Sequence, residues 1–226
     1  MEIYLIGTNH WDVNSESRLE RKLSEIAPEF ILVEGSYEVD AWINRSYALF
    51  SKELAKVMKF EESRHLILKS RVAIGNEFRA VRGHCIRYGK KFEYFNDLDL
   101  KNTIGNEKKV AKLEAQVFKG LKYQDILFEM KSEEASNNKV WKQIKEVEDT
   151  SKEYNLTDYF ISEAKDDNIG ARDYIMELKV RNSFCENISL RLVCVTGYVH
   201  VLDDLQNRTL YTKIKELSPK RVFLYE

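Results

Sequence analysis

Two of the four histidines in the sequence follow a glycine by three positions, directly after a short apolar run. The first pattern reads GTNH at Gly7–His10, and the second reads GYVH at Gly197–His200. Glycine has no Cβ and lets the chain turn sharply at a strand end, so the imidazole three residues later can point back over that end. One Gly-x-x-His is common, but two at matching places predict a shared functional site.

A carboxylate stands at a comparable place after another apolar run. Glu34 directly follows residues 29–33, which read EFILV. Imidazole nitrogen together with carboxylate oxygen suits Zn²⁺, Mn²⁺, Co²⁺ or Fe²⁺. A bound ion with an open position lowers the pKa of a coordinated water to about 7 and so supplies a nucleophile. We therefore expect His10, His200 and Glu34 to hold a divalent metal, with Glu34 acting either as a ligand or as a general base.

The elements that must position these residues occur twice in the chain. Residues 2–6 and 29–33 are short apolar runs typical of strands, and residues 15–27 between them have helical spacing, with Ser15 as the expected N-cap. The same order returns near the end, where strand, helix and strand are expected at residues 191–196, 204–217 and 221–225. We interpret this as two repeated βαβ units, whose strands run parallel.

The segment between the two repeats is mostly helical in pattern. Helices are expected at residues 37–71, 75–88, 106–154 and 157–181, with Gly89 as a C-cap and one strand at residues 92–95. Asp97 and Asp99 follow that strand and are supporting candidates for the site. The predicted fold is therefore α/β: one domain over residues 1–226, with a mostly parallel central sheet and residues 106–181 as a helical cap or insertion. Ligands of such sheets collect beyond the carboxyl ends of the strands.

Composition narrows the class of protein. Net charge is −1, and the basic and acidic residues are intermixed, which predicts binding neither to nucleic acid nor to an anionic membrane surface. No stretch approaches the roughly 20 apolar residues that span a bilayer, and the opening residues do not resemble a signal peptide. The three cysteines are odd in number and show no Cys-x-x-Cys spacing, and the cytoplasm is the default location that we expect. His65 is expected to be solvated and His84 to pack in the interior.

Six short blocks in order resemble the TraB/PrgY/GumN family, part of the broader group that contains the Tiki proteases, the erythromycin esterases and the ChaN-like proteins. Ile6–His10 is similar to the family's opening Gly-Thr-x-His, and Ala27–Glu34 is similar to its Pro-Asp-hydrophobic-Glu strand. Gly75–Ala80 resembles its Gly-x-Glu-Met-Arg-Ala helix start, and Asn96–Leu100 resembles its Asp-Arg-Asp-Ile. Ala171–Met176 resembles its Glu-Arg-Asp-x-x-Met, and Thr196–His200 resembles its closing Gly-x-x-His. Leu98 and Ala171 depart from the pattern, which has Arg and Glu there.

The resemblance implies a divalent-metal hydrolase, with a peptidase or amidase as the first hypothesis and Mn²⁺, Co²⁺ or Zn²⁺ as the cofactor. By motif it assigns the metal to His10, His200 and Glu34, and places Arg172 where it binds a substrate carboxylate or an oxyanion. Supporting positions by motif are Gly7, Gly197, Glu77, Arg79, Asp97 and Asp99. The expected partner is a peptide or another small molecule, and the long helical insertion is compatible with a homodimer. Two alternatives stay open: a non-catalytic module that binds a peptide or haem, and an interaction protein with a vestigial site.

Overall fold

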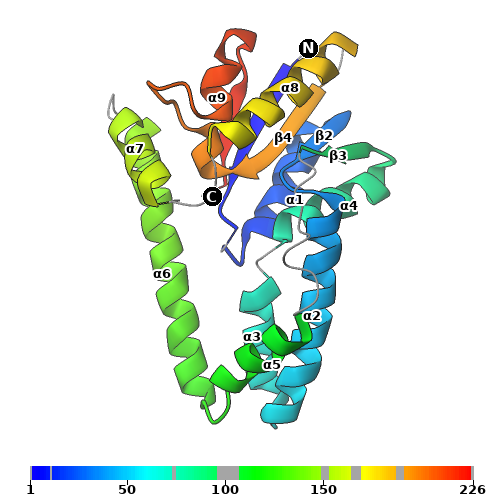
Figure 1. The fold of residues 1–226 in the computed structure, drawn as a ribbon, viewed down its shortest axis with the longest axis vertical. Coiled ribbons are helices and arrows are strands. Elements are labelled where there is room, and N and C mark those ends of the chain that lie inside the picture. Colours follow the sequence, from blue (N-terminus) through cyan, green and yellow to red (C-terminus); the bar gives the residue numbers. More distant parts are fainter. Residues whose placement is uncertain are drawn as a thin grey trace.

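One parallel sheet forms the centre of the molecule (Figure 1). The structure, a computed structural model, describes residues 2–10, 12–72, 75–95, 107–148, 153–163, 169–186 and 191–224. Within this part of the chain the strand order is β3-β2-β4-β1-β5, and every pair is parallel. The strands are β1 (Glu2–Thr8), β2 (Phe30–Val33), β3 (Lys91–Tyr94), β4 (Arg191–Gly197) and β5 (Lys220–Phe223). The predicted α/β class with a mostly parallel sheet is confirmed.

Helices surround the sheet and extend beyond it. They are α1 (Ser15–Ile26), α2 (Tyr37–Val57), α3 (Glu61–Val72), α4 (Asn76–Tyr88), α5 (Glu107–Val117), α6 (Tyr123–Glu148), α7 (Glu153–Glu163), α8 (Ala171–Glu186) and α9 (Leu210–Lys213). Two 3₁₀ turns, η1 (Tyr198–Val201) and η2 (Lys215–Leu217), flank α9. Among the described residues, no helix has the length and apolar character needed to cross a membrane.

The two repeated units interleave in the sheet. β1 pairs with β4 along its whole length and with β5 on its other side, while β2 pairs with β4 and β3. Each unit therefore has a strand of the other unit between its own two strands. β1, β2 and β4 are buried on both faces, which explains why they read as continuous apolar runs rather than as alternating patterns. The edge strand β3 alternates between exposed and half-buried residues. Cys194 is fully buried in β4 and packs as a small apolar residue of the core.

Two local predictions near the repeats are wrong. Ser15 is the first residue of α1 and Asn14 is its N-cap, with no capping bond from the side chain. The helix expected at residues 204–217 is broken: Asp204 accepts a hydrogen bond from the backbone N–H of Arg208, and Asn207 has a positive φ of 55°. These turn contacts compete with helical hydrogen bonds, and Thr209 then caps the short α9 by accepting from the N–H of Thr212.

Packing divides the helices between two regions. α1 and α4 cover one face of the sheet, whereas the end of α6 together with α7, α8 and α9 covers the other. The far half of α2, with α3, α5 and the start of α6, forms a separate helical arm around its own apolar cluster, which includes Phe50, Leu54 and Ile126. The predicted insertion therefore contributes to both regions rather than forming one cap.

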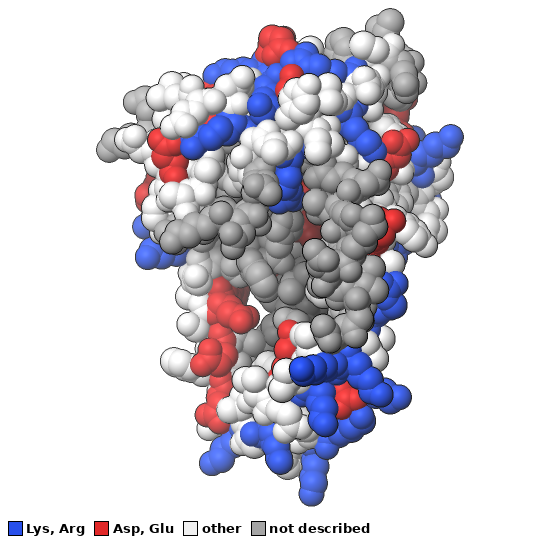
Figure 2. Space-filling view, viewed as in Figure 1, with Lys and Arg blue, Asp and Glu red and all other residues white. Residues whose placement is uncertain are grey.

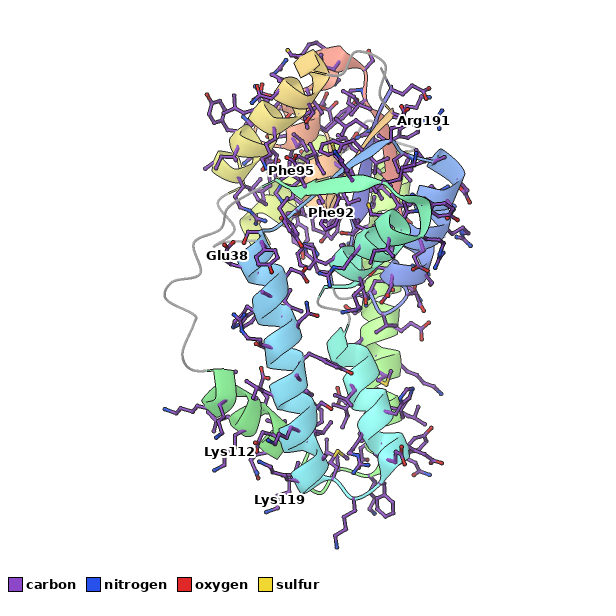
Figure 3. All side chains as sticks on the ribbon, turned by 90° about the vertical axis from the view of Figure 1, so that its right-hand side faces the viewer. Glu38, Phe92, Phe95, Lys112, Lys119 and Arg191 are labelled. Carbon is purple, nitrogen blue, oxygen red and sulfur yellow. The ribbon has the colours of Figure 1, made fainter. Side chains whose placement is uncertain are left out.

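The arm projects away from the sheet. Figure 3 shows α2 beginning beside the sheet at Glu38 and running down to the end of the arm, where Lys112 and Lys119 lie. Acidic side chains follow α6 on one side of the arm, and basic side chains gather over its opposite lower end (Figure 2). The middle of α6 is solvent-exposed, in agreement with the charged run in this part of the sequence.

Candidate active site

The register of the sheet brings the two Gly-x-x-His turns together. Gly7 pairs with Thr196 and Thr8 pairs with Gly197, so β1 and β4 end at the same level of the sheet. On the other side of β4, Val33 pairs with Val195, which places Glu34 at the same edge. The turns at His10 and His200, far apart in the sequence, are therefore neighbours at the carboxyl ends of the strands, where parallel sheets bind their ligands.

Glu34 is the buried centre of this edge, with 8% of its surface exposed. Its Oε2 accepts hydrogen bonds from the backbone N–H of Gly197 at 2.7 Å and from the hydroxyl of Thr196 at 2.6 Å. Its Oε1 accepts from the Arg172 guanidinium and lies 3.4 Å from Nε2 of His200. Burial alone would raise the pKa of this carboxyl, but His200 and Arg172 hold it well below its usual value. Glu34 is therefore a carboxylate.

His200 lies in η1 and is almost completely buried. Its Nδ1 is 2.8 Å from Oδ1 of Asp173, the first-turn acid of α8, and its Nε2 faces Glu34. Asp173 is itself held by the backbone N–H groups of Gly170 and Leu210. Burial would lower the pKa of His200, but Glu34 and Asp173 together outweigh it and raise this pKa to about 10. The metal-free imidazole is therefore protonated at neutral pH.

His10 is arranged in a similar way but is more open to solvent. Its Nδ1 lies 3.0 Å from Oε1 of Glu77, which is buried in the first turn of α4. About half of the His10 side chain is exposed. Partial desolvation of the ring lowers its pKa, while Glu77 and Glu34 raise it, with a net result of about 9. In return, the interaction with His10 lowers the pKa of Glu77.

Gly197 is the point around which these groups gather. A Cβ placed on this glycine would lie 3.2 Å from Nε2 of His10, 3.6 Å from Oε2 of Glu34 and 3.6 Å from Cδ2 of His200. The absence of a side chain at Gly197 therefore leaves the space that the three functional groups share. Its φ of −56° is ordinary, so this glycine is needed for space and not for backbone conformation.

A cavity of about 180 Å³ opens beside this cluster. His10, Glu34, Glu77 and Arg172 contribute its charged lining, and strands β2 and β4 with helices α2 and α4 contribute apolar side chains. Arg172, from the first turn of α8, thus reaches both the cavity and Glu34. The cavity therefore has one imidazole, two carboxylates and a guanidinium in its lining, while His200 lies buried behind Glu34 and does not line it. Imidazole, carboxylate and guanidinium groups together can polarise a carbonyl group and activate water.

The donor types suit a divalent cation. In each imidazole Nδ1 is held by a carboxylate, which is the arrangement that fixes metal-binding histidines so that Nε2 is the ligand atom. Glu34, Glu77 and Asp173 bring three negative charges against one on Arg172, so either two imidazolium protons or one divalent ion balances the cluster. Among the residues that the structure describes, no group of three or more His, Cys, Asp or Glu side chains is placed so that it could hold a metal ion. The metal stays a prediction, with His10, His200 and Glu34 as its ligands.

The other expected site residues differ in their positions. Gly7 packs beneath Tyr198 and Phe223, and Glu77 is the partner of His10. Arg79 bonds to Glu16 of α1 and does not line the cavity, so it joins α1 to α4. Asp97 and Asp99 lie outside the described residues.

Asp173 and Thr196 were missed as site residues by the sequence reasoning. Both stand next to predicted ones, Asp173 beside Arg172 and Thr196 beside Gly197, and both lie in blocks that resemble the TraB/PrgY/GumN motifs, where Asp173 matches the Asp of Glu-Arg-Asp-x-x-Met. Of the remaining histidines, His65 is exposed and His84 is buried against Tyr88, as expected.

Comparison with known proteins identifies no relative of this chain: no protein-family model matches it, and neither a curated protein nor a solved structure is significantly similar.

Proposed function

We propose that this protein is a divalent-metal-dependent hydrolase of amide or ester bonds, with a peptidase or amidase as the first candidate. The observation that carries the proposal is the convergence of His10, Glu34 and His200 around Gly197, beside a cavity that Arg172 also lines. The resemblance to the TraB/PrgY/GumN family supports the same activity. Buried clusters of ionic groups are often no more stabilising than apolar packing. Stability alone therefore does not account for a buried carboxylate surrounded by two imidazoles and a guanidinium.

The metal would be held by Nε2 of His10, Nε2 of His200 and the Glu34 carboxylate. When bound, it would supply a water of lowered pKa as the nucleophile. Glu77 and Asp173 fix the two rings through Nδ1. Since a base for neutral pH needs a pKa near that pH, the lowered pKa of Glu34 favours the role of ligand over that of base.

Arg172 stabilises the negative charge that develops on the substrate oxygen. Arg172 lines the cavity and its side chain is 20% exposed, so it can reach bound substrate while Glu34 holds its guanidinium in place. Oriented cations of this kind contribute strongly to acyl transfer because they are in position before the reaction begins. Arg172→Lys retains the charge but loses the planar group, and we expect it to lower kcat more than it raises KM.

The test is hydrolysis of a fluorogenic peptide and ester library by protein purified without chelator and supplied in turn with Mn²⁺, Co²⁺ and Zn²⁺. We expect turnover that needs the ion and falls at least 100-fold in His10→Ala and in His200→Ala. His65→Ala is the matched control, because His65 lies exposed on α3. Turnover that is unchanged in His10→Ala would reject the proposal, whereas ligand binding without turnover in any metal would favour a binding module.

A further inference from the structure

We propose that the substrate carries a single apolar side chain, between a branched aliphatic group and one aromatic ring in size, next to the bond that is cleaved. Val39, Ile43 and Phe78 receive this side chain in the cavity. The inference rests on the proposed function for the identity of the reaction, but it rests on the cavity alone for the chemistry of the ligand.

The cavity has two different kinds of wall. Its charged lining residues belong to the ion-paired cluster at the strand ends, whereas α2 contributes Val39 and Ile43 and α4 contributes Phe78. A ligand that fills it therefore places a polar, cleavable group against His10 and Arg172 and an apolar group against these helices. Cavities with convergent polar groups on an apolar lining are the usual form of small-molecule sites.

Two contacts of Phe78 fix the apolar wall. Gly35 has a φ of 120°, and a Cβ there would fall 2.7 Å from the Phe78 ring, so the ring lies directly on the glycine backbone. Phe78 also packs edge-on against Tyr94, with ring centroids 5.7 Å apart. The ring therefore has little room to move toward Gly35 or Tyr94, and Val39 and Ile43 of α2 are the other apolar lining residues that helices contribute.

The volume sets the size of the group. An apolar protein cavity of roughly 150 Å³ accepts one benzene molecule. The present cavity, at about 180 Å³, therefore accommodates a side chain such as that of leucine or phenylalanine.

The apolar part of the cavity disfavours ligands with charged side chains. The ionic groups of the cavity are already paired: His10 with Glu77, and Arg172 with Glu34. A lysine, glutamate or phosphorylated side chain seated among Val39, Ile43 and Phe78 would lose its hydration and gain no counter-charge, which is costly. The lining thus selects an uncharged apolar group.

The test compares three blocked amino acids, N-acetyl-leucine amide, N-acetyl-glycine amide and N-acetyl-lysine amide, whose side chains alone differ. Dissociation constants are measured by chemical-shift titration on the wild-type protein. We expect leucine to bind at least about tenfold tighter than glycine or lysine, since burial of a leucine side chain contributes that much or more. Equal affinity of the three probes, or failure of all three to bind, would overturn the inference.

Filling the cavity provides the second measurement. Ile43→Trp should abolish the preference for leucine, with Val39→Phe as a second variant if the first unfolds. Ile86→Trp is the matched control, because Ile86 is 77% exposed on α4 and lies outside the cavity. A leucine preference that persists in both folded cavity variants would contradict the assignment. If the protein prefers the leucine probe but hydrolyses no substrate, this inference holds and the hydrolase proposal fails. If it hydrolyses substrates but shows no preference for leucine, the hydrolase proposal holds and this inference fails.

Discussion

Glu34 Oε2 accepts a hydrogen bond of 2.7 Å from the backbone N–H of Gly197, joining the ends of β2 and β4. The same carboxylate contacts Arg172 of α8 and His200 of η1, so four segments depend on one negative charge. A buried carboxylate is tolerable only where such partners replace its hydration. The functional cluster is therefore also a structural junction, and substitutions in it are best chosen to keep shape while changing charge.

Glu34→Gln should destabilise the fold strongly. The amide preserves size but leaves His200 and Arg172 without their shared counter-charge, and breaking a buried pair in this way costs about 3–5 kcal/mol. Urea denaturation followed by circular dichroism measures the loss in the free energy of unfolding. Glu25→Gln is the control, because Glu25 forms an exposed pair with Lys22 on α1 and should change the midpoint little. Equal midpoints for Glu34→Gln and wild type would contradict the ionic role assigned to Glu34.

Gly197→Ala should separate function from stability. The backbone conformation of Gly197 accepts alanine, but the added Cβ would press on Nε2 of His10 at 3.2 Å. His10 is half-exposed and can move aside, so we expect a melting temperature within a few degrees of wild type and at least a tenfold loss of metal affinity or turnover. Calorimetry and metal titration measure the two effects. Gly83→Ala, in the middle of α4, is the matched glycine control.

The central geometry of the site follows from the sequence because it depends on strand ends. His10, Glu34 and His200 each follow an apolar run, and parallel strands end at one edge of a sheet. The repeated order of elements also indicated that the two runs belong to similar units. The interleaving of these units could not be predicted, because a local pattern contains no information on which strands become neighbours.

Contacts made by helices were harder to predict. Asp173 holds His200 across 27 positions, and Glu77 holds His10 across 67. Such contacts depend on how each helix is rotated about its axis, and an apolar stripe roughly 100° wide defines that rotation only coarsely. Arg79 illustrates this: it lies two residues beyond Glu77 on α4 and therefore points to α1 instead of into the cavity.

Stability of the metal-free protein should fall as pH rises from 7 to 10. The folded-state pKa of His200 is about 10, above the ordinary value of 6.5. Between these values the folded state binds more protons than the unfolded state, so the free energy of unfolding decreases with pH. The contribution is complete below about pH 6.5 and is lost above the folded-state pKa. Urea midpoints at several pH values test this, and His200→Gln should flatten the slope, whereas His65→Gln should not.

Binding of a divalent ion at pH 7 should release protons into solution. With pKa values of about 9 and 10, His10 and His200 are both protonated in the metal-free protein, and an ion must displace those protons to reach Nε2. We therefore expect about two protons released per ion and an affinity that rises steeply with pH. Isothermal titration of Mn²⁺ or Zn²⁺ in two non-coordinating buffers of different ionisation enthalpy gives the number. His10→Gln should reduce it to about one, while the surface variant His65→Gln leaves it unchanged. An ion that binds without proton release would lie elsewhere on the molecule, and the charge balance argued for Glu34, Glu77 and Asp173 would then not involve a metal.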